Sequence, residues 1–185
     1  MFNAKFAFIV VCFAIALFSY PFCCDKKNWI WLVFAMAFTV GADYFLVIEN
    51  WHLSGVLVFC GAHICYISRV LKPSHKLNIF RVLVIIAAIW LFRRESLTVL
   101  AGLYATLFIT NIVLHAKFCK INKPLVLMGL VLFLLCDINV ALFNLPRHFD
   151  ISFTFAWAFP LIWIFYLPSQ LLLSVSAIAF PRAKE

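Results

Sequence analysis

Hydrophobic and polar positions divide the chain into long apolar stretches, joined by short segments that carry most of the charged residues. A helix needs about 20 mainly apolar residues to cross a bilayer. The pattern therefore predicts an all-α membrane protein, a bundle of seven transmembrane helices in a single polytopic membrane domain over residues 1–185. The predicted helices span residues 2–22, 29–48, 53–71, 77–92, 96–116, 124–143 and 151–180.

The last stretch is unlike the others, because its 30 residues are too many for one straight span and too few for two. Pro160 and Pro168 lie inside it. Proline removes a backbone donor and clashes with the preceding turn of a helix. We therefore expect the two prolines to kink this helix.

The composition excludes the ordinary soluble class, since 66% of the residues are hydrophobic and 12% are charged. Soluble domains are roughly half apolar. The net charge of +8 comes from basic residues that lie mainly between the apolar stretches. We interpret these residues as topology signals and as contacts to anionic lipid headgroups at cytoplasmic loops, and expect no nucleic-acid partner.

The distribution of the basic residues predicts an orientation. Eleven of the 15 lysines and arginines fall on one side of the seven predicted spans, and four fall on the other. Cytoplasmic loops carry the excess of basic residues in membrane proteins. The sequence thus predicts a multi-pass protein of the cell (plasma) membrane, with its N-terminus outside and its C-terminus in the cytoplasm.

Aspartates inside two predicted spans are the main indication of function. A carboxylate at membrane depth costs several kcal/mol unless it faces a protein interior or a wet cavity. At about 1.5 Å per residue, Asp43 lies roughly 8 Å and Asp137 about 9 Å below the outer surface. Tyr104 falls at about 12 Å and His63 at about 15 Å. Four helices therefore contribute polar side chains to one slab in the outer half of the membrane.

Other polar residues within the spans have a purely structural interpretation. Intramembrane polar side chains often only join helices by hydrogen bonds, which suits Asn111, Asn139 and Gln170 taken singly. Asn111 is expected nearer the inner surface than the slab. Tyr166 and Gln170 are one turn apart on the last helix, so they share a face.

The structural interpretation does not suit the two aspartates. The nearest basic residues, Lys5, Arg69 and Arg81, lie toward helix ends, from which long side chains reach the interface. A packing role would leave both buried carboxylates without a counter-charge. We therefore expect Asp43 and Asp137 to share protons with each other or with a neighbouring histidine. A carboxyl that keeps its proton suits general acid catalysis.

Motifs of several membrane and enzyme classes are absent from the sequence. The last helix has no central lysine for retinal, and neither aspartate lies in the GxGD motif of intramembrane aspartyl proteases. There is also no HExxH, GxSxG or glycine-rich phosphate loop. We expect no metal and no cofactor.

The stretches that carry the polar residues resemble the motifs of a known family. Residues 40–46 (VGADYFL) and 55–66 (GVLVFCGAHICY) resemble the G-D-x-x-L and G-x-x-x-F-x-x-x-H-x-x-Y helices of the YhhN family. Residues 129–137 (GLVLFLLCD) resemble its G-x-x-x-F-x-x-S-D helix, and residues 166–172 (YLPSQLL) its Y-x-x-x-Q-x-L helix. The family usually has eight helices. Here Cys136 stands where serine is common, and Ala42 separates Gly41 from Asp43.

The resemblance implies a lysoplasmalogenase, a hydrolase that cleaves the vinyl ether bond of lysoplasmalogens, a class of lysolipid, taken from the bilayer. The products are a fatty aldehyde and a glycerophospho-head group. On this basis Asp43 and Asp137 are the catalytic residues. The supporting or substrate-binding residues are His63, Tyr66, Tyr104, Asn139, Tyr166 and Gln170.

A second class of function fits the same residues. Buried carboxylates and a proline-containing last helix also suit a proton-coupled transporter or a lipid-binding membrane protein without hydrolytic activity. The absence of a visible internal repeat favours the enzyme.

Overall fold

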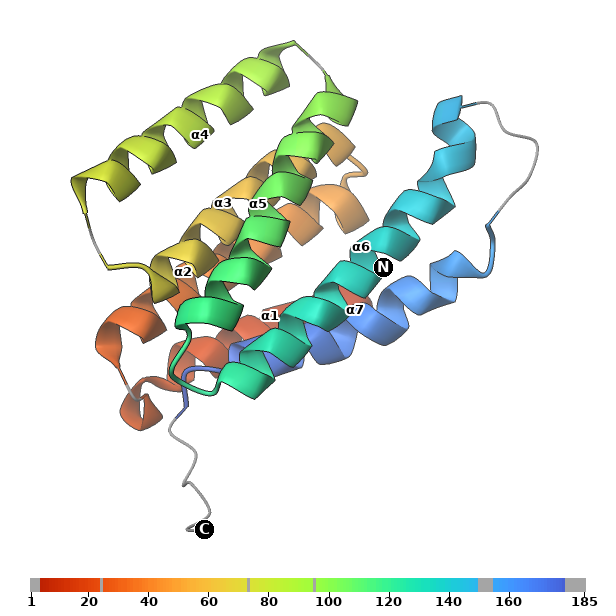
Figure 1. Cartoon of the computed structure of the whole chain (residues 1–185). Helices are drawn as coiled ribbons and strands as arrows, with labels where there is room; N and C mark the ends of the chain where they lie inside the picture. Colours follow the sequence, from red (N-terminus) through yellow and green to blue (C-terminus); the bar gives the residue numbers. More distant parts are fainter. Residues whose placement is uncertain (1–3, 24, 73, 95, 150–154, 179–185) are drawn as a thin grey trace.

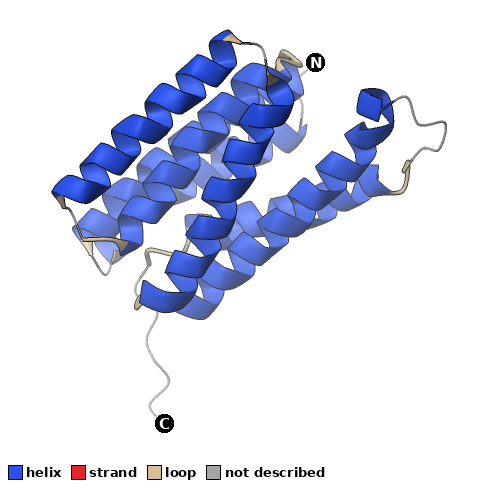
Figure 2. Ribbon diagram, turned by 45° about the horizontal axis from the view of Figure 1, so that its top comes forward, coloured by secondary structure: helices blue, strands red, loops and turns tan. Residues whose placement is uncertain are grey.

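The computed structural model of the chain describes residues 4–23, 25–72, 74–94, 96–149 and 155–178. These residues form seven α-helices joined by loops, with no β-strand among them (Figure 1, Figure 2). The predicted all-α fold and the number of helices are confirmed. The helices are α1 (Ala4–Phe18), α2 (Lys26–Asp43), α3 (His52–Val70), α4 (His75–Arg93), α5 (Leu97–Phe118), α6 (Lys123–Phe149) and α7 (Ala158–Ser174).

Six of the seven helices close into a ring. Each of them packs against the next in the order α1, α2, α3, α5, α6, α7, and α7 returns to α1. Helix α4 lies outside this ring and packs against α3 and α5 (Figure 1). Side chains that point to the middle of the ring are removed from the surroundings of the protein, so polar groups there must find partners within it.

The start of α2 and the end of α6 extend beyond their predicted positions. Helix α2 begins at Lys26, three residues early, because the side chain of Asp25 caps it. The Asp25 carboxylate accepts hydrogen bonds from the backbone N–H groups of Lys27 at 3.1 Å and Asn28 at 3.3 Å. Such a cap satisfies donors that lack an intrahelical partner. Helix α6 extends to Phe149, six residues beyond its predicted end.

The prediction for the last helix is wrong at both ends. The described helix is Ala158–Ser174, which is 17 residues long. The first four and last two residues of the predicted 151–180 lie outside the described residues. Pro160 falls in the first turn of α7, where its missing N–H has no helical partner to lose. Pro168 lies inside the helix as predicted.

The end of α2 is irregular directly after Asp43. Residues Tyr44–Ile48 form a wider, π-helical turn, in which the N–H of Glu49 bonds to the carbonyl of Tyr44 at 3.1 Å. Asn50 then adopts a left-handed conformation with φ 58° and ends the turn. π-helical turns of this kind occur often at functional sites.

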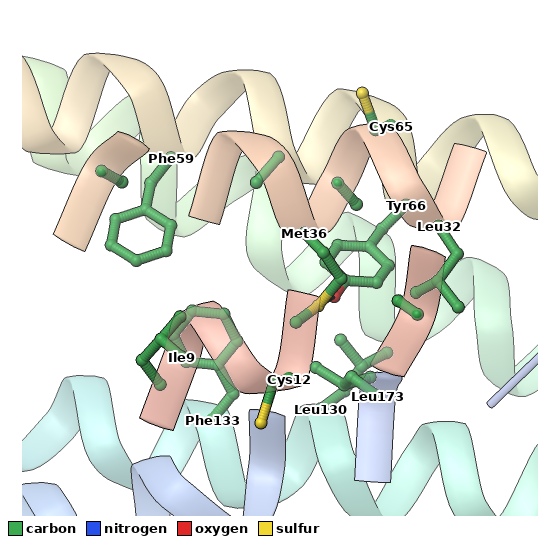
Figure 3. Close-up of a cluster of buried hydrophobic side chains, with 14 of the residues drawn as sticks. Ile9, Cys12, Leu32, Met36, Phe59, Cys65, Tyr66, Leu130, Phe133 and Leu173 are labelled. Carbon is green, nitrogen blue, oxygen red and sulfur yellow. Dashed lines mark hydrogen bonds between the residues drawn. The ribbon is translucent and has the colours of Figure 1, made fainter. Parts of the chain in front are cut away.

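The interior of the ring is mainly apolar, and small residues let its helices approach closely. Figure 3 shows Ile9, Leu130, Phe133 and Leu173 among the buried side chains. A Cβ atom at Gly129 would lie 2.9 Å from Cγ of Leu173. A larger residue at this position would force the Leu173 side chain to shift, so Gly129 permits the observed approach of α6 to α7.

The outer surface is also apolar, as expected for helices that face lipid. Val11, Ile86, Met128 and Ile164, on four different helices, have exposed side chains. Together with the family assignment given below, this surface supports a membrane protein. Two helices, Ala4–Phe18 and Ala158–Ser174, are apolar but short for a span. The helices in the described residues that are long and apolar enough to cross a bilayer are Lys26–Ile48, His52–Val70, Leu97–Phe118 and Lys123–Pro146.

Candidate active site

Asp43 is the last residue of α2, and its side chain is buried inside the ring with 3% exposure. The hydroxyl of Tyr166, on α7, donates a hydrogen bond to Oδ2 of Asp43 at 2.6 Å. Tyr166 is buried as well, with 4% exposure. This bond connects α2 and α7, the two helices that flank α1 in the ring.

Asp137 forms a second pair of the same kind. Its Oδ2 accepts a hydrogen bond of 2.5 Å from the hydroxyl of Tyr104 on α5. Both side chains of this pair are half-buried, so it is less enclosed than the Asp43–Tyr166 pair. A short bond from a hydroxyl to a carboxylate is the strong, charge-assisted kind.

Aromatic rings join the two pairs. Phe133 of α6 lies 5.5 Å from the ring of Tyr166 and 5.9 Å from the ring of His63, measured between centroids. His63 in turn lies 5.0 Å from the ring of Tyr104. The carboxyls of Asp43 and Asp137 are near enough to interact electrostatically. The structure thus brings Asp43, Asp137, Tyr104 and His63 together.

Asn111 is a further polar residue of this region, and the expectation that it lies apart from the slab is wrong. Its Nδ2 lies 3.2 Å from Nδ1 of His63. His63 stands 11 positions after the first residue of α3 and Asn111 stands 14 after that of α5. The difference is about 4.5 Å along the helix axes, which two side chains span easily. A depth estimate that ignores side-chain reach therefore separates residues that touch.

The other three predicted supporting residues form their hydrogen bonds with groups other than the two carboxyls. Tyr66 is fully buried, and its hydroxyl donates to Sδ of Met36 at 3.5 Å (Figure 3). The Nδ2 of Asn139 donates to the carbonyl of Leu135 on its own helix at 2.7 Å. Gln170 is fully buried one turn after Tyr166, and its Oε1 has no partner among the described residues. Of the three, Gln170 is the one that presents an unpaired polar atom on the same face as Tyr166.

Arg69 is buried, whereas we predicted that its side chain reaches the membrane interface. It is 9% exposed and is held between helices by neutral partners. Its Nε donates to Oδ1 of Asn28 at 2.7 Å, and its Nη2 donates to Oγ of Ser176 at 2.9 Å. The buried guanidinium therefore ties α3 to the start of α2 and to the residues after α7.

The two carboxyls are chemically able to donate and to accept protons. Two carboxyls that sit in different surroundings divide a proton between them, because burial disfavours a charge more at one than at the other. Within the described part of the chain, no group of three or more His, Cys, Asp or Glu residues is placed to hold a metal ion.

Comparisons with known proteins agree with the sequence motifs. The YhhN family matches residues 2–177, which is nearly the whole chain. Comparisons with curated proteins and with solved structures each find no match. The family match covers all seven helices and both Asp–Tyr pairs, and the chain therefore belongs to the YhhN family.

Proposed function

We propose that this protein is an intramembrane hydrolase that cleaves the vinyl ether bond of lysoplasmalogen-type lysolipids. The observation that carries the proposal is the pair of Asp–Tyr hydrogen bonds inside one ring of apolar helices. Carboxyls in such a setting lower the stability of the fold. Residues of this kind therefore usually serve a reaction or a transport cycle. Membership of the YhhN family supports the enzyme.

In this proposal all seven helices cross the cell membrane as one domain. The N-terminus lies outside, the C-terminus lies in the cytoplasm, and the basic cytoplasmic loops contact anionic headgroups. The lysolipid enters the ring from the bilayer, and its head group stays at the outer surface. The shallow predicted depth of Asp43 and Asp137, roughly 8–9 Å, supports this direction of entry.

The chemistry requires one proton donor and one group that handles water. Asp43 gives its proton to the alkene carbon that is not bonded to the ether oxygen. The other alkene carbon and the oxygen then form an oxocarbenium ion. Asp137 takes a proton from water as the water attacks that ion, which gives a hemiacetal. The hemiacetal loses its hydroxyl proton to Asp43, and the leaving glycerol oxygen takes the proton held by Asp137. One water is consumed, and both carboxyls return to their starting states.

The surroundings of the two carboxyls support this division of roles. A charge is costly in a fully enclosed site, so the more buried Asp43 suits the neutral acid. Asp137 is half-buried, and its partner Tyr104 packs against His63, which contacts Asn111, so this carboxyl lies in the more polar setting and suits contact with water. A pair of carboxyls in unequal environments performs acid and base chemistry in several enzyme classes.

The remaining residues position these groups. Tyr104 and Tyr166 orient the carboxyls through their hydroxyls, and His63 packs against Tyr104. The unpaired Oε1 of Gln170 is suited to bind a hydroxyl of the substrate. Tyr66 joins α3 to α2 through Met36, whereas Asn139 bonds to the carbonyl of Leu135 on its own helix.

The test is aldehyde release from a lysoplasmalogen by detergent-purified protein. We expect release by the wild type and its loss in Asp43→Asn and in Asp137→Asn. Asp25→Asn is the matched control, because asparagine caps a helix about as well as aspartate does. Absence of release by folded wild type, or full release by either site variant, contradicts the proposal.

A proton-coupled transporter or a lipid-binding protein is the second candidate. It is favoured by the buried polar residues that continue past the Asp–Tyr pairs, such as His115 and Arg69. Transport predicts that the lysolipid enters liposomes unchanged, and binding predicts saturable capture without aldehyde. Either result, in protein that releases no aldehyde, would replace the hydrolase.

A further inference from the structure

Four buried polar side chains follow one line between α3 and α5, and we call them the polar seam: His63, Arg69, Asn111 and His115. Asn111 contacts His63 at 3.2 Å, and Nδ1 of His115 lies 3.0 Å from the carbonyl oxygen of Asn111. Arg69 lies within electrostatic reach of His115. One end of the seam therefore meets Tyr104, next to His63, and the other meets the start of α2.

The length of the seam exceeds the reach of any one side chain. Tyr104 and His115 are 11 residues apart on α5, which is about 16 Å along the helix axis. On α3, His63 and Arg69 are separated by about 9 Å. The seam thus connects the Asp137–Tyr104 pair to the end of the bundle that holds Arg69, Asn28 and Ser176.

Every member of the seam has a buried polar atom without a hydrogen-bond partner among the described residues. These atoms are Nε2 of His63, Nη1 of Arg69, Oδ1 of Asn111 and Nε2 of His115. Buried polar groups are almost always paired, and one left unpaired costs about 1–3 kcal/mol. Residues that served only to hold helices together would pair with one another instead.

The unpaired atoms include both donors and acceptors. Nη1 of Arg69 can only donate, and Oδ1 of Asn111 can only accept. With its Nδ1 donating to the Asn111 carbonyl, His115 has an acceptor at Nε2. With Nδ1 accepting from Asn111, His63 has a donor at Nε2. Water, which donates and accepts, satisfies all four atoms, whereas an anion or a cation satisfies only one kind.

We propose that the polar seam binds a chain of water molecules that links the Arg69 end of the bundle to the Asp137–Tyr104 pair. Its role rests on the proposed hydrolysis, which consumes one water per turnover in a site that the lysolipid itself closes toward the outer surface. Water that reaches Asp137 through the seam comes from the opposite end and does not have to pass the substrate.

The water can be detected without any activity. X-ray radiolysis of the purified protein in water enriched in oxygen-18 oxidises side chains that lie beside bound water, and mass spectrometry locates the label. We expect labelling of His63, His115 and Tyr104 in spite of their burial. Cys12 is fully buried in the apolar interior and is intrinsically reactive, so it is the dry control. Seam residues labelled no faster than Cys12 overturn the proposal.

A substitution then connects the water to turnover. Asn111→Leu replaces the amide by an apolar group of similar size. We expect this variant to show less labelling at His63 and His115. We also expect its kcat to fall about tenfold, with KM unchanged. Asn144→Leu is the matched control, since Asn144 is a half-buried residue of α6 whose side chain bonds to the carbonyl of Val140 on its own helix. His115→Gln, which keeps a polar group, should recover part of the loss seen in His115→Leu.

The outcomes separate this proposal from the hydrolase. Labelled seam residues in a protein that releases no aldehyde remove the hydrolase and leave the water chain. Aldehyde release with unlabelled seam residues, or with full kcat in Asn111→Leu, removes the water chain and leaves the hydrolase.

Discussion

The two Asp–Tyr pairs have the same hydrogen bond in different surroundings. Asp43 and Tyr166 are both buried, and the rings of Phe133 and Trp163 pack against Tyr166. Asp137 and Tyr104 are half-buried, and His63 beside Tyr104 leads to further polar residues. The same two side chains thus occur once in a fully buried setting and once at the end of a polar seam.

In the proposed mechanism, the surroundings of each carboxyl decide its role. A dry carboxyl is most stable with its proton and can deliver it, whereas a carboxyl in contact with water can accept one. The backbone adds to the contrast, because Asp43 precedes a π-helical turn and Asp137 lies within the continuous helix α6.

Removal of either carboxyl should nearly abolish turnover. We expect Asp43→Asn and Asp137→Asn each to lower kcat by about 10²–10⁴, the range for loss of a general acid or base. The double variant should fall little further, because groups that act in one cycle are not additive. Steady-state aldehyde release measures all three variants, and independent, multiplicative losses would show that the pairs do not act together.

The tyrosine hydroxyls should differ in their effect on stability. Tyr166→Phe leaves the enclosed Asp43 without its donor, at a cost of about 1–3 kcal/mol in the free energy of unfolding. Tyr104→Phe should cost less, because water can replace the hydroxyl at the half-buried Asp137. Unfolding in detergent compares the two variants. Equal losses would mean that the two settings do not differ in access to water.

Close helix packing beside Asp43 gives a third test. A Cβ at Gly55 of α3 would overlap the side chain of Leu46, in the turn that follows Asp43. Gly55→Ala should therefore destabilise the fold by about 1–3 kcal/mol. Gly102→Ala is the control, since nothing lies within 4 Å of a Cβ there, and it should stabilise α5 by about 0.5–1 kcal/mol. A neutral Gly55→Ala would show that the π-helical turn adapts without effect.

The smallest effect is expected at Asn139, which lies near Asp137 in sequence but bonds its own helix. Asn139→Leu should change the free energy of unfolding by less than about 0.5 kcal/mol and leave kcat unchanged within about twofold. Thermal unfolding and aldehyde release measure the two quantities. A large loss of kcat would place the unpaired Oδ1 of Asn139 in the site.

Local patterns were enough to predict much of this molecule. Apolar runs predicted seven helices, and aspartates within such runs singled out Asp43 and Asp137, since few residues are as costly there. Depth along each helix placed Tyr104 and His63 at a similar level, and the structure brings them together. These features depend on spacing along one helix at a time.

Features that depend on several helices were not predictable in this way. The neighbourhood of α3 and α5, which are not consecutive, brings Asn111 to His63. The burial of Arg69 depends on Ser176, more than 100 residues away in the chain. The start of α7 also failed as a prediction, because Phe155, Ala156 and Trp157 continue the hydrophobic run without continuing the helix.

In the proposed reaction Asp43 protonates carbon and Asp137 activates water, and hydrolysis in D₂O distinguishes these two roles. The aldehyde released by the wild type, reduced at once to the alcohol, should carry one deuterium at the carbon next to the former carbonyl. Unreacted substrate recovered from Asp137→Asn should gain deuterium at the same carbon, because protonation without water attack reverses, and substrate from Asp43→Asn should gain none. An aldehyde without deuterium, or the opposite pattern in the two variants, would show that the two aspartates do not have these roles.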